Sequence, residues 1–174
     1  MGPMSAIETP LGSGKDGGQA PDLPEDFAPE LPREVRYLKW TIAHAIKDAR
    51  VDKLRADQRR RCTCLLGTTL HGMRAAGRYI RSGNLTDLRE FIAGRTLQLA
   101  IDDSVMGGWN ATTCSACSSS LGSIALGVTL LQNEQADLVI AGGYDPISEY
   151  VWAGFNSLRL VADGPLRPFA KNRQ

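Results

Sequence analysis

The sequence has no long hydrophobic run and only two histidines. No apolar stretch approaches the roughly 20 residues that a membrane-spanning helix needs. The N-terminus is polar and rich in Gly and Pro, and it lacks the apolar segment of a secretory signal. The net charge is +1, so there is no strong field to attract nucleic acid or an anionic membrane. We therefore expect a cytoplasmic protein that binds neither nucleic acid nor a membrane.

The few histidines and cysteines of this sequence limit the metal sites that it could form. His44 and His71 are far apart and match no local metal-ligand spacing. The cysteines are Cys62, Cys64, Cys114 and Cys117. In a reducing compartment they are not expected to form structural disulfides, which leaves packing, metal binding or chemistry. Together they could bind zinc, or the C-x-x-C pair could be redox-active, but C-x-C is an uncommon zinc half-site. We keep a zinc or redox module as an alternative.

Gly and Pro set the N-terminal region apart from the rest. Residues 12–18 read Gly-Ser-Gly-Lys-Asp-Gly-Gly, and prolines at four later positions up to residue 32 prevent a continuous helix. We predict a flexible Gly/Pro-rich arm over residues 1–33 and a folded domain over residues 34–174.

Apolar spacing predicts the first elements of this domain. A helix is expected to begin near Glu34, because apolar residues recur on one face from there. Residues 62–67 are typical of a short buried strand, and residues 74–81 of one or two helical turns. Residues 85–100 show helical spacing, with Asn84 or Thr86 as the capping candidate.

The last third of the domain predicts a βαβ unit. Residues 109–116 are expected to form a strand, residues 118–133 a helix, and residues 136–141 a continuous apolar strand. Continuous apolar strands are typical of parallel sheets that helices cover on both faces. The helix is predicted to bury a stripe made of Leu121, Ile124, Ala125, Val128 and Leu131. The fold class is therefore α/β.

Cys117 lies at the predicted corner between strand and helix. The amides of Ser118, Ser119 and Ser120 are expected to be unpaired first-turn donors that favour a thiolate over a thiol. Small serines leave room for a substrate, and an acyl group could be held on the sulfur as a thioester. A small buried cysteine is the alternative interpretation of this position.

The segment around Cys117 resembles the active site of β-ketoacyl synthases, including polyketide ketosynthases. Residues 113–121 read Thr-Cys-Ser-Ala-Cys-Ser-Ser-Ser-Leu, where the family typically has Thr-Ala-Cys-Ser-Ser followed by a helix. The similarity continues at residues 136–137, 141–143, 154–155, 157–159 and 167–169. Residues 62–72 also resemble the family's strand that ends in Gly-Thr. The spacing to residues 141–143 aligns Cys117, rather than Cys114, with the nucleophile.

The resemblance implies a thiolase-like fold, of which this chain would be the N-terminal half: a mostly parallel sheet with covering helices and a βαβ unit around the nucleophile. It further implies a β-ketoacyl-ACP synthase-type acyltransferase in fatty acid or polyketide condensation. Cys117 would take an acyl group from the phosphopantetheine of an acyl carrier protein. Cys114 would be a structural residue on the preceding strand. No further cofactor and no metal are implied, and family members are usually homodimers.

Departures from the family pattern limit the expected activity. The family completes its catalytic set with two histidines and a lysine from the C-terminal half, whereas His44 and His71 both precede Cys117. Ala170 replaces the acidic residue that usually follows Arg-Pro-Phe. We therefore expect a truncated domain that condenses poorly alone, as a homodimer or paired with a chain that supplies the missing half. A non-catalytic synthase-like partner subunit and a thiolase-type enzyme remain as alternatives.

Overall fold

The computed structural model describes residues 2–3, 16–17, 20–101, 105–162, 167 and 169–171. The chain divides into two compact units: Leu23–Pro146, and a smaller one made of Met1–Asp22 and Ile147–Gln174. None of the helices in the described ranges is both long and apolar enough to cross a membrane.

A three-stranded parallel sheet forms the centre of the larger unit. Its order is β4 (Ala111–Thr113), β3 (Cys62–Gly67) and β5 (Leu138–Gly143). The middle strand β3 is buried along its whole length, as the sequence predicts. In the register, Gly67 pairs with Thr113 on one side and with Gly143 on the other. The carboxyl ends of all three strands therefore meet at one edge of the sheet.

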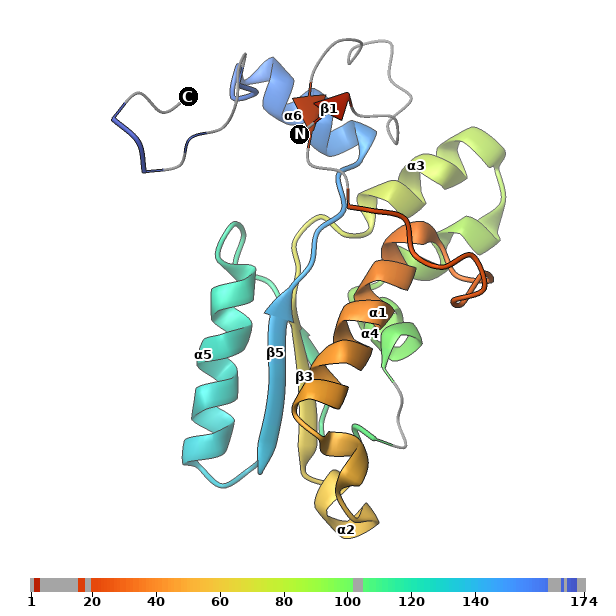
Figure 1. Cartoon of the computed structure of the whole chain (residues 1–174). Helices are drawn as coiled ribbons and strands as arrows, with labels where there is room; N and C mark the ends of the chain where they lie inside the picture. The colour runs from red at the N-terminus through yellow and green to blue at the C-terminus, as the bar shows by residue number, and fades with distance from the viewer. Residues whose placement is uncertain are drawn as a thin grey trace. The chain divides into compact units, whose positions relative to one another are not determined.

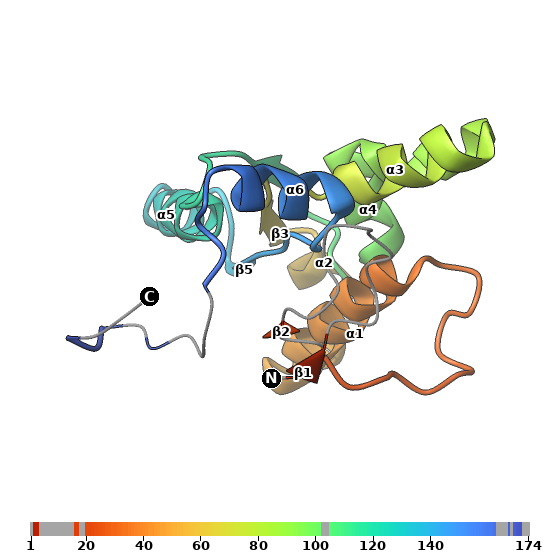
Figure 2. The same cartoon turned by 90° about the horizontal axis from the view of Figure 1, so that it is seen from above.

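Helices cover both faces of this sheet. Figures 1 and 2 show α5 (Ser119–Gln132) against one face, and α1 (Arg33–Asp48) and α4 (Ala93–Ala100) on the other side. Because successive strand residues point to opposite faces, β3 contributes to both layers. Leu65 packs with Leu130 of α5. The other layer joins α1 and α4 to alternate residues of β3: Leu38, Ile42, Ile46, Leu97, Ala100, Cys62, Cys64 and Leu66. The predicted βαβ unit is thus confirmed as β4–α5–β5, with β3 between its strands.

An ion cluster ties α1 to the segment that follows β3. Arg78 on α3 (Met73–Ser82) donates to Glu34 on α1 at 2.5 Å and to Glu90 on η2 (Leu85–Phe91) at 3.1 Å. The Glu34 and Glu90 side chains are only 8% and 11% exposed, so their carboxylates need nearby positive charge. Arg78 supplies it to both, and Arg74 also lies 3.7 Å from Glu34.

The prediction that an apolar stripe of α5 is buried is wrong. The five residues of that stripe are all exposed, and Leu121 is 66% exposed. The sheet-facing side instead consists of Ser119, Ser123, Gly127 and Leu130. The physical reason is close packing: a Cβ added at Gly127 would lie 3.0 Å from a methyl carbon of Val139 on β5. Small residues therefore face the sheet, and the apolar stripe faces away from it.

Two predicted elements differ in extent. The helix expected over residues 85–100 is broken at Ile92, into the 3₁₀ segment η2 and helix α4. Asn84 caps the first piece as expected, since its Oδ1 accepts from Thr86 N at 3.0 Å. The strand expected over residues 109–116 is shorter and consists of β4 alone. Two short helices, η1 (Val51–Lys53) and α2 (Ala56–Arg59), lie between α1 and β3 in the chain.

The smaller unit contains a short antiparallel pair, β1 (Gly2–Pro3) and β2 (Asp16–Gly17), and helix α6 (Glu149–Ser157). Ser148 caps α6 by accepting from Val151 N at 3.2 Å. The predicted arm over residues 1–33 falls partly outside the described residues, and so does the motif at residues 167–169, of which residue 168 is not described. The domain boundary at residue 34 stays a prediction.

Candidate functional site

Cys117 lies in a tight turn that joins β4 to α5. Ser118 N donates to Ser115 O at 3.0 Å and Ser119 N donates to Ala116 O at 3.1 Å, so two successive i→i+3 bonds close the turn. Ala116 has a φ of 49°, in the left-handed region that costs a residue with a Cβ about 1–2 kcal/mol. This conformation changes the chain direction sharply and leaves Cys117 exposed.

The prediction of three free amides beside Cys117 is wrong for two of them. Ser118 N and Ser119 N are used in closing the turn and are not vacant donors. The serine hydroxyls support the same turn, since Ser118 Oγ donates to Ser115 O at 2.7 Å. The turn is therefore held by its own backbone and side chains. The Ser118 and Ser119 amides thus stabilise the shape of the turn.

Two facing glycines let the first turn of α5 sit directly on the edge of the sheet. We call Gly67 at the end of β3 and Gly143 at the end of β5 the glycine notch. A Cβ at Gly67 would lie 2.0 Å from Ser119 O, and one at Gly143 would lie 2.4 Å from Ser120 Cβ. Any larger residue would push α5 outward. The notch therefore fixes the height at which the helix, and with it Cys117, meets the sheet.

The hydroxyl of Thr69, which sequence reasoning did not single out, bonds to this turn from the loop after β3. It lies 2.9 Å from Ala116 O and 2.8 Å from Ser119 Oγ. Ser119 Oγ in turn accepts from Ser115 N at 2.9 Å, and its side chain is buried. The only signal in the sequence was the Gly-Thr pair at the end of the predicted strand, which does not specify a contact 50 residues away.

The comparisons with known proteins identify the family. A family model described as the N-terminal domain of β-ketoacyl synthases matches residues 22–174. The chain belongs to the β-ketoacyl synthase family. No curated protein sequence matches it significantly.

Solved structures show the thiolase-like fold of the family. A β-ketoacyl synthase from Burkholderia phymatum STM815 is 23% identical with a TM-score of 0.56, over 91% of this chain and 42% of that one. The ishigamide ketosynthase/chain length factor is 21% identical with a TM-score of 0.67, over 84% and 39%. A ketosynthase in complex with its chain length factor from Xenorhabdus doucetiae is 24% identical with a TM-score of 0.60, over 90% and 41%. The chain thus spans about two fifths of the length of these structures.

The four free cysteines of this ketosynthase-family chain fall into two groups, two buried and two exposed. Cys62 and Cys64 are buried in β3, and burial raises the pKa of both thiols, that of Cys64 to about 11. Cys114 and Cys117 are exposed. The expectation that Cys114 lies on a strand is wrong: it follows β4, with Sγ 3.8 Å from Thr69 Oγ1. Within the described ranges, no three His, Cys, Asp or Glu side chains gather as metal ligands would, so the four-cysteine zinc arrangement is not formed.

His71 also lies in the loop after β3. Its Nε2 is 3.0 Å from Phe91 O, so the neutral ring donates from Nε2. Its Nδ1 is buried without a hydrogen-bond partner in the described part of the chain. Burial lowers the pKa of His71, although the Phe91 carbonyl and Asp145 oppose this effect. His71 is therefore a neutral packing residue at neutral pH.

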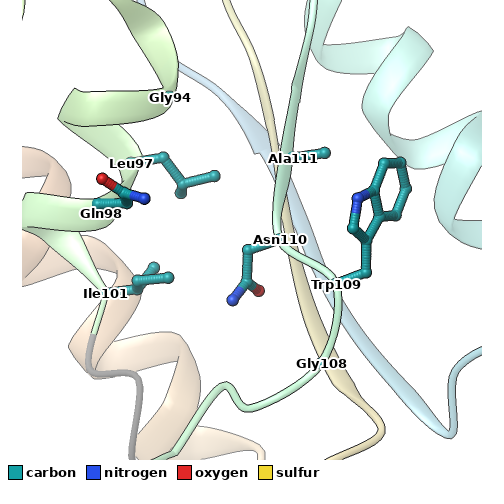
Figure 3. A pocket seen from close by; sticks show the side chains of 8 residues that line it. All are labelled: Gly94, Leu97, Gln98, Ile101, Gly108, Trp109, Asn110 and Ala111. Carbon is teal, nitrogen blue, oxygen red and sulfur yellow. The ribbon is translucent and has the colours of Figure 1, made fainter.

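A cavity of about 310 Å³ lies between α4 and the segment leading into β4 (Figure 3). Leu97 and Ile101 extend into it from the side of α4, and Asn110 lies on the other side. The amide of Asn110 is bonded at both its oxygen and its nitrogen, since it accepts from Cys64 N at 2.7 Å and donates to Met106 O at 2.8 Å. Neither Cys117 nor Thr69 lines this cavity. It is thus separate from the candidate nucleophile.

Proposed function

We propose that this chain supplies the acyl-accepting part of a β-ketoacyl synthase, with Cys117 as the nucleophile. The observation that carries the proposal is the exposed thiol on a strained turn at the start of α5, in the segment that resembles the family's active site. The other exposed thiol, Cys114, precedes the turn and lacks this placement.

In the proposed step, the Cys117 thiolate attacks the carbonyl carbon of an acyl thioester on the phosphopantetheine of an acyl carrier protein. A carbon–sulfur bond forms, and the tetrahedral adduct collapses by breaking the bond to the pantetheine sulfur. The pantetheine thiolate leaves and takes up a proton. The acyl group then remains on Cys117 as a new thioester, so one thioester replaces another.

Condensation is proposed to need residues from outside this span. The family's decarboxylation site uses histidines that would follow the nucleophile, and no histidine follows Cys117 here. The exposed apolar stripe of α5 is a surface for the residues that complete the family fold, because exposed apolar patches mark association surfaces. Two of the matched structures are described as a ketosynthase with a chain length factor, which supports pairing with another chain.

The test is transfer of an acyl group from an acyl N-acetylcysteamine thioester, a short mimic of acyl-pantetheine. Intact mass is expected to rise by one acyl group, and peptide mapping is expected to place it on Cys117. Cys117→Ala should abolish the transfer, whereas the matched control Cys114→Ala should retain it. Acylation of Cys114 would contradict the assignment. No transfer at all would favour a non-catalytic partner subunit.

A further inference from the structure

Asp145 fixes the loop after β3 from the end of the neighbouring strand. It follows β5 by two residues, and its Oδ1 accepts from Thr68 Oγ1 at 2.7 Å, Thr69 N at 3.0 Å and Leu70 N at 2.8 Å. Its Oδ2 also lies 3.2 Å from Thr69 N. The parallel pairing continues beyond the strands, since Tyr144 N donates to Gly67 O at 3.0 Å. A single carboxylate thus binds three consecutive loop residues, through the Thr68 hydroxyl and the backbone amides of Thr69 and Leu70.

The loop passes this constraint on to the turn that carries Cys117. Thr69 links Asp145 to this turn. Its backbone amide donates to the Asp145 carboxylate, and its hydroxyl donates to Ala116 O. Thr69 and Ser119 both lie within 2.9 Å of Ala116 O and 2.8 Å from each other. Each hydroxyl has one hydrogen to donate, so either both donate to Ala116 O, or one donates to Ala116 O and the other donates to its neighbouring hydroxyl.

The residue that accepts these bonds is the one that is strained. Ala116 is held at a φ of 49° directly before Cys117. Such a conformation persists only where surrounding contacts impose it. Without the Thr69 hydroxyl, the turn keeps its local bonds but loses the hydrogen bonds that reach it from the loop after β3.

We propose that Asp145 and Thr69 are positioning residues for the nucleophile: the Asp145 carboxylate fixes Thr69, and the Thr69 hydroxyl holds Ala116 in the conformation that aims Cys117 at the acyl carbonyl. This inference rests on the proposed acyl transfer to Cys117. Neither residue touches the reacting atoms.

The first measurement is amide hydrogen exchange in peptides that cover residues 113–122. Thr69→Val removes the hydroxyl and Asp145→Ala removes the carboxylate. Exchange is expected to rise about fivefold in both, which is the factor for one lost hydrogen bond of about 1 kcal/mol. Thr69→Ser keeps the hydroxyl and should exchange like wild type. The matched control is Asp137→Asn, because Asp137 lies at the other end of β5 and pairs with Arg61 at the surface.

The second measurement compares two reactions at Cys117 in the same variants. Iodoacetamide needs an exposed thiolate but no alignment of the sulfur with an acyl carbonyl, so its rate at Cys117 should be unchanged. Acyl transfer needs an aimed sulfur, so its rate should fall about fivefold in Thr69→Val and Asp145→Ala and recover in Thr69→Ser. A purely structural role would not separate the two rates.

Each outcome has a defined meaning. Unchanged exchange in Thr69→Val, a Thr69→Ser variant as defective as Thr69→Val, or equal losses in Asp137→Asn would overturn the positioning role. Labelling of the buried Cys62 and Cys64 would show that a variant has lost its fold, and Asp145→Asn then replaces Asp145→Ala. If wild type takes up no acyl group, the proposed function fails, while the exchange measurement still decides the positioning role.

Discussion

Substitution of Gly67 by Ala tests how closely α5 must approach the sheet. The added Cβ would lie 2.0 Å from Ser119 O and 2.7 Å from Ser120 N, both backbone atoms that cannot rotate away. Ordinary contact begins at 3.4 Å, so the first turn of α5 would have to move by the difference, 1.4 Å. Overpacking of this kind costs about 1–3 kcal/mol, and the upper end applies because backbone must shift.

Ala also lowers the conformational entropy of the unfolded chain, and this stabilising effect offsets only part of the overpacking cost. Replacing Gly by Ala at a compatible backbone position stabilises a protein by about 0.4–1 kcal/mol. The net loss in unfolding free energy for Gly67→Ala is therefore about 2 kcal/mol, measured by urea unfolding followed by circular dichroism. Acyl transfer to Cys117 should also slow, because the turn moves with α5.

Gly142→Ala is the matched control. Gly142 lies on the adjacent strand, one residue before the notch, and a Cβ there meets nothing within 4 Å. This variant should be more stable than wild type by about 0.4–1 kcal/mol. If Gly67→Ala proves as stable as Gly142→Ala, the close approach of α5 to the sheet edge is refuted.

Three further predictions follow from buried titratable groups. Arg78→Ala takes the Arg78 partner from Glu90 and leaves Glu34 with the longer Arg74 ion pair at 3.7 Å, so it should lower the urea-unfolding free energy by about 3 kcal/mol; a loss below about 1 kcal/mol would contradict the ion cluster. Burial raises the pKa of Cys64 from 9.0 to about 11, so stability should fall as pH rises through that window by about 3 kcal/mol, and Cys64→Ala should remove this slope. Burial lowers the pKa of His71 below 6.5, so only the unfolded chain gains a proton just below that pH; stability should fall as pH drops from 6.5, and an unchanged slope in His71→Asn would exclude His71 as its source.

The strands and helices were largely predictable because their signals are local. The buried strand at residues 62–67 matches β3, and the predicted helix over residues 118–133 matches α5 within one residue at each end. In both cases the apolar content and the flanking glycines or serines set the limits. The parallel pairing followed from the continuous apolar strand of β5.

Which side of α5 is buried could not be predicted, because the more hydrophobic side of this helix is the exposed one. Periodicity assigned Leu121 and Val128 to the core, whereas the structure buries Ser123 and Gly127. The deciding factor is the short distance between helix and sheet, which only small side chains permit. Such a distance is a tertiary property with no local pattern.

The position of Cys117 at the corner between β4 and α5 was predictable, but the contacts around it were not; its role as the nucleophile stays a prediction. The motif and its spacing pointed to the residue, and the structure places it exposed on the expected corner. The contacts from Asp145 and Thr69 join segments 76 residues apart, and they depend on the sheet order β4-β3-β5. The paired state of the Ser118 and Ser119 amides depends on turn geometry, which the sequence alone did not specify.

The most direct test of the account is the order in which the four thiols react. Native protein is treated with iodoacetamide at neutral pH, and samples taken over time are mapped by peptide mass spectrometry. We expect Cys117 to be labelled first and Cys114 later, with Cys62 and Cys64 protected until the chain is unfolded. Labelling of Cys114 before Cys117, or of either buried thiol in the native state, would contradict it.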